Sequence, residues 1–405
     1  MVECISGEVR DGFSFLAYLF LETHHVGEGV QKPLSRRYQE RGGAVKYLFV
    51  VIVLCVFFTS PFSFSQEFDQ EIEKDYPLRS IGKLIVTNPW GDVSVQGWPF
   101  DKIRIKFKKK VQAENLEKAK SYFDSVHYSF HSSERNIEIS TQYSSELNIA
   151  ERLNEKAHSK ISMDMILLAP ANLNLRIWTT SGKINLKSWG SSSELRSNSG
   201  SIRVDGVKSN ILSILCASCP IQVKNIESSL RCVGGSGPLD LHNIRGKNIY
   251  AETDTAFLKV SRVQGDQLYI SKTGQIDGQF LTGKIQFHNK SGSVQLREIS
   301  GFLSGSAEKG SISASIKEWE FLDKAIIESV QGNIDLVLPR HFSGDVDLKS
   351  VTGKVAIDFP VEILQDLIQA GPEPVNHLVG KIRDGGELLK IFTENGNIHV
   401  FKGKL

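Results

Sequence analysis

The sequence has almost no net charge and few prolines, and each of these features excludes some classes of protein. It carries 48 lysines and arginines against 46 aspartates and glutamates, a formal charge of +2 over 405 residues. No strong field of one sign follows, so nucleic acid is not a favoured partner. Twelve prolines beside 34 glycines exclude a collagen-like or proline-rich disordered chain. A hydrophobic content of 40% allows the chain to bury a core.

Apolar runs are also short. The run at 47–58 has 12 residues, whereas a membrane-spanning helix needs roughly 20. Four basic residues precede this run, and the small residues Ser63 and Ser65 follow it. A basic start, a short apolar stretch and small residues at positions −3 and −1 are the parts of a secretory signal peptide. We therefore predict a signal peptide at 45–65, preceded at 1–44 by a gene-start extension or a disordered segment. The mature chain is expected to be exported without a membrane span, to the periplasm, the outer surface or the medium.

Cysteine is scarce, and motifs of catalysis are missing. Cleavage would leave Cys216, Cys219 and Cys232, which permit one disulfide in an exported protein and leave its pairing open. The Cys216-x-x-Cys219 spacing lacks a second CxxC or a nearby pair of histidines, so we interpret the cysteines as small core residues rather than a zinc site. The sequence has no GxSxG, HExxH, phosphate-binding glycine loop or calcium nonapeptide. No cofactor and no metal is predicted.

A short repeat fills the chain from residue 180 onward. A small residue, usually glycine after Ser or Thr, recurs at spacings of 18, 19, 18, 19, 18, 18 and 18, then 22, 21 and 43. We call it the anchor. The anchors are Gly182, Gly200, Cys219, Gly237, Ala256, Gly274, Gly292, Gly310, Gly332, Gly353 and Gly396. Many copies of a short period indicate a solenoid, and helical repeats are excluded because they need roughly 33 residues per unit or more.

Apolar and polar residues alternate after each anchor. Two places on, all 11 residues are aliphatic, and three places on, ten of the 11 are not apolar. This alternation is typical of a strand with one buried face. A second short strand precedes most anchors, so each period is one coil of strand, turn, strand and turn. We predict that the first set stacks as one internal ladder, the core ladder: Ile184, Ile202, Ile221, Leu239, Leu258, Ile276, Val294, Ile312, Ile334, Val355 and Ile398.

The predicted fold class is therefore all-β. We expect a parallel β-solenoid with coils of 18–22 residues at 171–405, preceded at 66–170 by a smaller β-rich segment with one helix. The expected elements outside the repeats are strands at 102–108, 136–141 and 161–169, a helix at 113–123, and a short helix at 361–370 before a loop inserted between late coils.

With these motifs the chain resembles the putative-adhesin β-strand-repeat family of bacterial envelope proteins over most of 80–405. The resemblance is carried by NPWGDVSVQGW at 88–98 with the basic strand after it, by Leu168-Ala-Pro170, by the serial Ser-Gly-x-Ile-x-Val units, and by the closing segment 380–400. It implies a parallel β-solenoid outside the cytoplasm, and it supplies no catalytic residues.

Charged residues in two places could be either catalytic or ligand-binding groups or parts of a solvated surface. Asp240, Asp277 and Asp335 take the polar place of separate coils, and Lys259 separates the first two. An acid–base pair needs carboxyls roughly 5–10 Å apart, so we interpret these residues as an outer face. We interpret the basic run 102–110 as an edge or outer strand kept soluble by lysines, with a patch for anionic glycans or lipid headgroups as the alternative.

The sequence thus favours an exported, non-catalytic structural or binding protein of the cell envelope, adhesin-like, with a repetitive β-surface. Its expected partner is an envelope glycan, a surface or a protein, without a more specific indication. The alternative hypothesis is a carbohydrate-active parallel β-helix enzyme, a polysaccharide lyase or hydrolase, because such enzymes also use β-helices.

Overall fold

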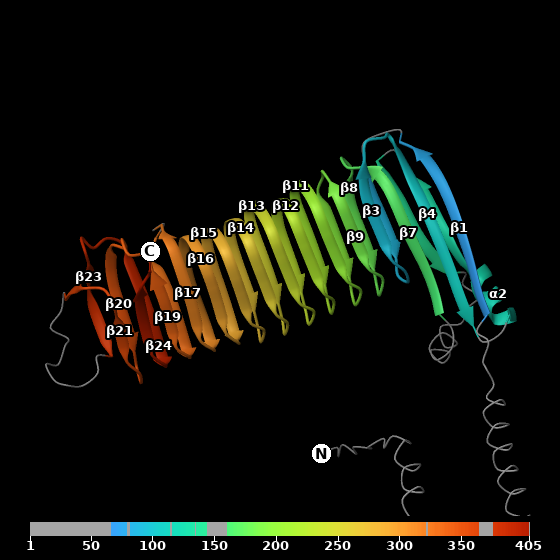
Figure 1. The fold of residues 1–405 in the computed structure, drawn as a ribbon. Helices are drawn as coiled ribbons and strands as arrows, with labels where there is room; N and C mark the ends of the chain where they lie inside the picture. Colours follow the sequence, from blue (N-terminus) through green and yellow to red (C-terminus); the bar gives the residue numbers. More distant parts are fainter. Residues whose placement is uncertain are drawn as a thin grey trace, which may run out of the picture. The chain divides into compact units, whose positions relative to one another are not determined.

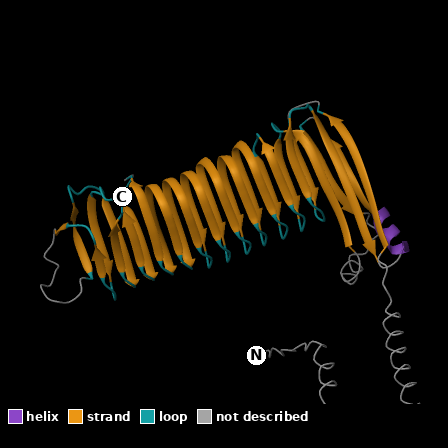
Figure 2. Ribbon diagram, in the orientation of Figure 1, coloured by secondary structure: helices purple, strands orange, loops and turns teal. Residues whose placement is uncertain are grey.

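The computed structural model describes residues 66–78, 82–113, 116–133, 135–143, 160–320, 323–363 and 376–404. These residues form one long series of β-strands with a helix near its N-terminal end (Figures 1 and 2). The predicted all-β parallel solenoid is confirmed. The predicted signal peptide and the segment 1–44 lie outside the described residues. Among the described residues, no helix has the length and apolar character needed to cross a bilayer.

The central coils are six long parallel strands that pair in chain order. Residues at the same place in successive coils are register partners, as with Ile221 and Leu239, so each coil lies directly on the next. Neighbouring strands in such a sheet are about 4.8 Å apart. The strands are β11 (Ile202–Cys216), β12 (Ile221–Gly234), β13 (Leu239–Thr253), β14 (Leu258–Ser271), β15 (Ile276–Ser291) and β16 (Val294–Lys309).

The turn expected in the middle of each coil is a corner within a continuous strand. Its first residue has a left-handed backbone, as in Asn225 with φ 55° and Asn243 with φ 54°. The residues after this corner stay paired, since Val207 is the partner of Ile226. The left-handed residues form a column with the period of the anchors: Ser188, Gly206, Asn225, Asn243, Arg262, Phe280 and Glu298.

The structure places the core ladder residues in one column inside the stack. Ile202 is the partner of Ile184 on one side and of Ile221 on the other, and the register continues through Ile276. These side chains are buried, except for half-buried Val355 in the last strand of the column. Burial of one such aliphatic side chain contributes roughly 1.5–3 kcal/mol, so the column provides much of the driving force for stacking.

A second internal column is polar. Three places before most anchors lies a buried residue whose side chain bonds turn backbone; for example, the Gly274 N–H donates to Ser271 Oγ at 2.9 Å, and Ser271 Oγ donates to the Gly274 carbonyl at 3.0 Å. This satisfies turn backbone that would otherwise be buried without a partner. We call this column the buried polar ladder; its hydroxyl and amide members are Asn88, Thr179, Ser197, Thr253, Ser271, Asn289, Ser329, Ser350 and Thr393.

The first coil precedes the region where the sequence repeats are regular. Strands β2 (Lys83–Asn88) and β3 (Val93–Trp98) pair in parallel with β8 (Asn174–Thr179) and β9 (Ile184–Trp189). Val93 is the partner of Ile184, so the core ladder extends into this coil. Strand β10 (Ser193–Ser197) then lies between β8 and β11 and pairs in parallel with both.

Strand β1, which precedes β2, and the strands between β3 and β8 in the sequence cover the end of the stack. β7 (Lys160–Pro170) lies beside β3, and β4 (Lys102–Ala113) and β1 (Gln66–Pro77) continue from it as antiparallel neighbours. β6 (Asn136–Tyr143) lies beside β2 with β5 (Val126–Ser132) antiparallel to it, and helix α2 (Leu116–Ser125) packs on β4. Such a cap closes a solenoid end that would otherwise offer unpaired strands.

The C-terminal strands do not stack in chain order. β17 (Ile312–Trp319), β18 (Ala325–Gln331) and β19 (Ile334–Leu338) follow β16, but β24 (Leu388–Asn395) and β25 (Ile398–Lys402) come next. β20 (Gly344–Ser350) and β21 (Val355–Ile357) lie beyond them. β23 (His377–Ile382) and β22 (Val361–Ile363) close this end antiparallel. Of the helix expected at 361–370, the first three residues are strand β22, and the others lie outside the described residues.

Candidate functional site: the outward ladder and its groove

The polar residues that follow each core ladder residue form one column on the outside of the stack. They are register partners from coil to coil, and their side chains are half-buried or exposed. Within the column the Gln222 amide donates to Asp240 Oδ2 at 3.3 Å. We call this column the outward ladder: Ser94, Asn185, Arg203, Gln222, Asp240, Lys259, Asp277, Gln295, Ser313, Asp335 and His399, with Ala356 at its end.

A groove of about 510 Å³ lies over the N-terminal end of the outward ladder. Its floor crosses β7, β3, β9, β11 and β12, and strand spacing gives it a length of about 19 Å. The side chains that face it come from the outward ladder and from the parallel column two places further on: Ser94, Gln96, Ile166, Leu168, Asn185, Lys187, Arg203, Asp205, Gln222 and Lys224.

The groove holds three cationic side chains against one carboxylate. Asp205 is the register partner of both Lys187 and Lys224, and its Oδ1 accepts a hydrogen bond from the Asn225 amide at 2.8 Å. Among the described residues, three groove cations have no partner of this kind: Lys187, Arg203 and Lys224. Within the described ranges, their side chains have no carboxylate within 4.0 Å and form neither a hydrogen bond nor a ring contact. The groove therefore carries an excess of unpaired positive charge.

Outside the groove, the outward ladder holds three carboxylates, Asp240, Asp277 and Asp335, against the lysine Lys259. Lys259 lies between Asp240 and Asp277 in register, and Arg297 forms an ion pair with Asp277 at 2.6 Å. Further on, His399 Nδ1 lies 3.2 Å from Asp335 Oδ1. The positive excess is thus confined to the groove.

The basic run that the sequence singles out is neutralised. β4 lies between β1 and β7, so it is an inner strand of the cap and not an edge; the edge is β1. Arg104 pairs with Asp75 at 2.7 Å, and Lys106 pairs with Glu71. Hydrogen bonds from Arg104 and Lys102 hold the pKa of Asp75 well below its usual range. A run with this many carboxylate partners is a poor site for an anionic ligand.

The carboxylates of the enzyme hypothesis do not converge. Asp240 and Asp277 are separated by a whole coil that carries Lys259, about 10 Å along the stack. They lie on an open sheet face, and each is already engaged by Gln222 or Arg297. In the part of the chain that the structure describes, no three His, Cys, Asp or Glu side chains are grouped so that they could hold a metal ion.

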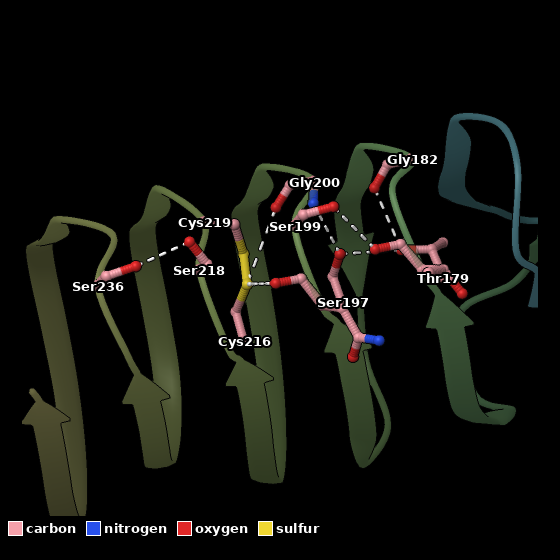
Figure 3. Close-up of a disulfide and its surroundings, with 11 residues drawn as sticks. Thr179, Gly182, Ser197, Ser199, Gly200, Cys216, Ser218, Cys219 and Ser236 are labelled. Carbon is pink, nitrogen blue, oxygen red and sulfur yellow. Dashed lines mark hydrogen bonds between the residues drawn. A yellow bond between two sulfur atoms is a disulfide. The ribbon is translucent and has the colours of Figure 1, made fainter. Parts of the chain in front are cut away.

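Cys216 and Cys219 form a disulfide across one anchor turn (Figure 3). Cys216 occupies a place in the buried polar ladder, as the register partner of Ser197, and Cys219 is the anchor of its coil. In the preceding coil, the Gly200 N–H donates to Ser197 Oγ at 3.1 Å. The disulfide therefore joins the two positions that a hydrogen bond joins in the neighbouring coil.

Cys232 is a free, buried thiol. Its register partners are Ile214 and Ala251, both in the core. Burial raises the pKa of the Cys232 thiol to about 12, so the thiol stays protonated at neutral pH and is a poor nucleophile.

Two features of the site were missed in the sequence. The groove cations are spread over three coils, so they form no charge run, and only the register of the coils brings them together. The buried polar ladder had a signal: Ser, Thr or Asn stands three places before most anchors, a position that the sequence analysis did not examine.

The geometry defines a parallel β-solenoid with a polar outer column and a cationic groove at its N-terminal end. Residues 227–401, which include most of the later coils, match the model of the Toastrack DUF4097 family. The resemblance seen in the sequence is confirmed. No curated protein matches the chain.

The solved structures that are similar to this chain include proteins from three bacteria. A putative cell adhesion protein from Clostridium sporogenes is 9% identical, with 83% of this chain and 100% of that chain covered and a TM-score of 0.19. A putative lipid binding protein from Parabacteroides distasonis is 13% identical, with 83% and 97% covered and a TM-score of 0.28. A putative adhesin from Bacteroides fragilis is 11% identical, with 82% and 97% covered and a TM-score of 0.21.

Proposed function

We propose that the chain is an exported, non-catalytic binding protein of the bacterial cell envelope, and that the outward ladder is its contact surface. The observation that carries this proposal is the division between the two faces of each strand. The inward places hold aliphatic side chains and turn-bonding polar groups, whereas the outward ladder varies from coil to coil among amide, hydroxyl, acidic and basic groups. A surface of this kind suits recognition of an extended partner by many modest contacts.

The same division argues against turnover chemistry. Catalytic groups usually lie in sheltered pockets where burial and neighbouring charges tune their pKa values. The carboxylates of the outward ladder lie on an open face, and Cys232 is enclosed by core residues. The alternative, a polysaccharide lyase or hydrolase, predicts release of reducing sugar or unsaturated product that is abolished by Asp240→Asn or Asp277→Asn.

Export is part of the proposal. The basic residues, the 12-residue apolar run and the Ser63/Ser65 pair support cleavage after Ser65, with 45–65 as the signal peptide. N-terminal sequencing of the protein recovered from fractionated cells tests this step. We expect a start near Gln66 in the periplasm, outer surface or medium; an intact 1–60 segment on a cytosolic protein contradicts it.

The binding function is tested with the purified protein on glycan arrays and in pull-downs from envelope fractions. We expect a retained glycan or envelope component whose binding weakens when the coil 275–292 is removed, because the contact is spread over several coils. Product release as described above, or no retained component from either source, would overturn the proposal.

A further inference from the structure

The groove at the N-terminal end of the outward ladder has the features of a ligand site. Here the side chains of three cationic residues on adjacent strands form neither an ion pair nor a hydrogen bond with a described residue, whereas the more conspicuous basic run on β4 is neutralised by β1. Leaving three cations unpaired on adjacent coils has a cost from mutual repulsion, which an anionic ligand would relieve. Asp205 offsets part of this charge only, since its carboxylate is engaged by Asn225.

The remaining groove residues indicate what kind of anion fits. Gln96 has no assigned partner among the described residues, and Asn185 donates only a 3.3 Å bond to Ser94 Oγ. Amides and hydroxyls of this kind bind a ligand rich in hydroxyl groups. At the β7 end, Ile166 is 37% exposed and offers an apolar contact for the carbon-bearing face of a sugar ring.

The shape of the groove favours a polymer. Lys187 and Lys224 lie about 10 Å apart along the stack with Arg203 between them in the adjacent column. This places positive charges at intervals along an open trough about 19 Å long, which suits a chain with repeating acidic groups. A lipid headgroup would need the cations alone, and an acidic peptide would not need the apolar contact that Ile166 offers to a sugar ring.

We infer that this groove binds an acidic polysaccharide, a polymer of uronic acid units, with Lys187, Arg203 and Lys224 contacting its carboxylates; the inference rests on the proposed binding function. Gln96, Asn185 and Gln222 bond the sugar hydroxyls. The polymer runs across the strands, parallel to the stack, so that successive acidic units meet successive coils.

The test compares two triple variants of the full-length protein that lose the same charge. The first is Lys187→Gln, Arg203→Gln and Lys224→Gln. The control is Lys247→Gln, Lys290→Gln and Lys309→Gln, three exposed lysines outside the groove. Binding is measured at about 0.15 M salt to polygalacturonate, with dextran, anionic lipid vesicles and polyglutamate as comparison probes, and circular dichroism verifies the fold of each variant.

We expect the wild type and the control to bind polygalacturonate alike, and the groove variant to lose about tenfold or more in affinity. Equal losses in both variants, preference for vesicles or polyglutamate, or no binding of the wild type to polygalacturonate overturns the inference. Binding of a neutral glycan or an envelope protein that neither variant affects also overturns it, and in that case the proposed function stands. Absence of any retained component in the array and pull-down overturns both.

Discussion

Ile334 and Ile398 are register partners on adjacent parallel strands, and Val355 lies on the far side of Ile398. The strand pair β24–β25 therefore separates two coils that are consecutive in the sequence. β24 lies between β18 and β20 in the same way. The C-terminal segment thus occupies an interior place in the stack, where it satisfies the backbone of strands on both sides.

This arrangement makes the last coil in the sequence more important than a terminal coil would be. Deletion of 388–405 should expose the edges of β18, β19, β20 and β21, and exposed parallel edges promote local unfolding and association. We expect a loss of thermal stability and a shift to larger species, measured by circular dichroism and size-exclusion chromatography.

An internal deletion of the same length is the control. Removal of 275–292 takes out one coil and joins Gly274 to Ser293, and because Gly292 stacks on Gly274 the remaining coils can keep their register. We expect this variant to remain folded and monodisperse with a smaller loss. Equal damage from both deletions would show that the interior place of β24–β25 does not matter for stability.

The period of the sequence was enough to predict the coils but not their order. Every coil presents an aliphatic residue two places after its anchor, so any coil can stack on any other, and nothing local in 388–402 distinguishes an interior place from an end. Chain order would place Ile398 beyond Val355. The structure places it between Ile334 and Val355.

Electrostatic features were predictable only in part, for a related reason. A charge run such as 102–110 is visible in the sequence, but its partners Glu71, Glu73 and Asp75 are identified only by the antiparallel register of β1 on β4. Conversely, Lys187, Arg203 and Lys224 are far apart in sequence and form no run. Stacking in register brings them into one groove.

The core ladder can be tested with one pair of substitutions. Ile276 is fully buried, and Ile276→Asp would place a carboxylate in the column without a partner. The cost should be several kcal/mol in the free energy of unfolding, measured by denaturant titration. The matched change Gln295→Asp lies at an exposed outward place one coil further on and should stay within about 0.5 kcal/mol. Similar losses at both positions would mean that the in–out assignment is wrong.

The ion pairs between β1 and β4 predict an acid-sensitive cap. Hydrogen bonds from Arg104 and Lys102 lower the pKa of Asp75 below its usual value of 3.8, and a hydrogen bond from Lys106 lowers the pKa of Glu71. A carboxyl with a lowered pKa in the folded state adds stability above its unfolded pKa, and this is lost as the pH falls. The melting temperature of the wild type should therefore exceed that of Asp75→Asn at pH 6, and the difference should shrink below about pH 4.

Asp101→Asn is the control for this titration, because Asp101 is exposed and has no ion pair among the described residues. Its melting temperature should differ from that of the wild type by little, and equally at both pH values. A difference between wild type and Asp75→Asn that is as large at pH 2.5 as at pH 6 would contradict an electrostatic role for Asp75 and point to packing instead.

The positions of the two disulfide cysteines predict which pair of residues can replace them. Because Cys216 and Cys219 occupy the positions of Ser197 and Gly200, the double variant Cys216→Ser, Cys219→Gly should form the hydrogen bond that the preceding coil has. A disulfide that closes so short a loop contributes about 2 kcal/mol, so the double variant should lie within about 2 kcal/mol of the oxidised wild type in denaturant unfolding. It should match or exceed the wild type under reducing conditions.

The informative control is Cys216→Ala, Cys219→Gly, which differs by one hydroxyl and leaves the buried anchor N–H without an acceptor, at a cost of about 1–3 kcal/mol. If the serine and alanine variants unfold at the same denaturant concentration, the buried polar ladder does not stabilise this turn, and the disulfide is not a substitute for it.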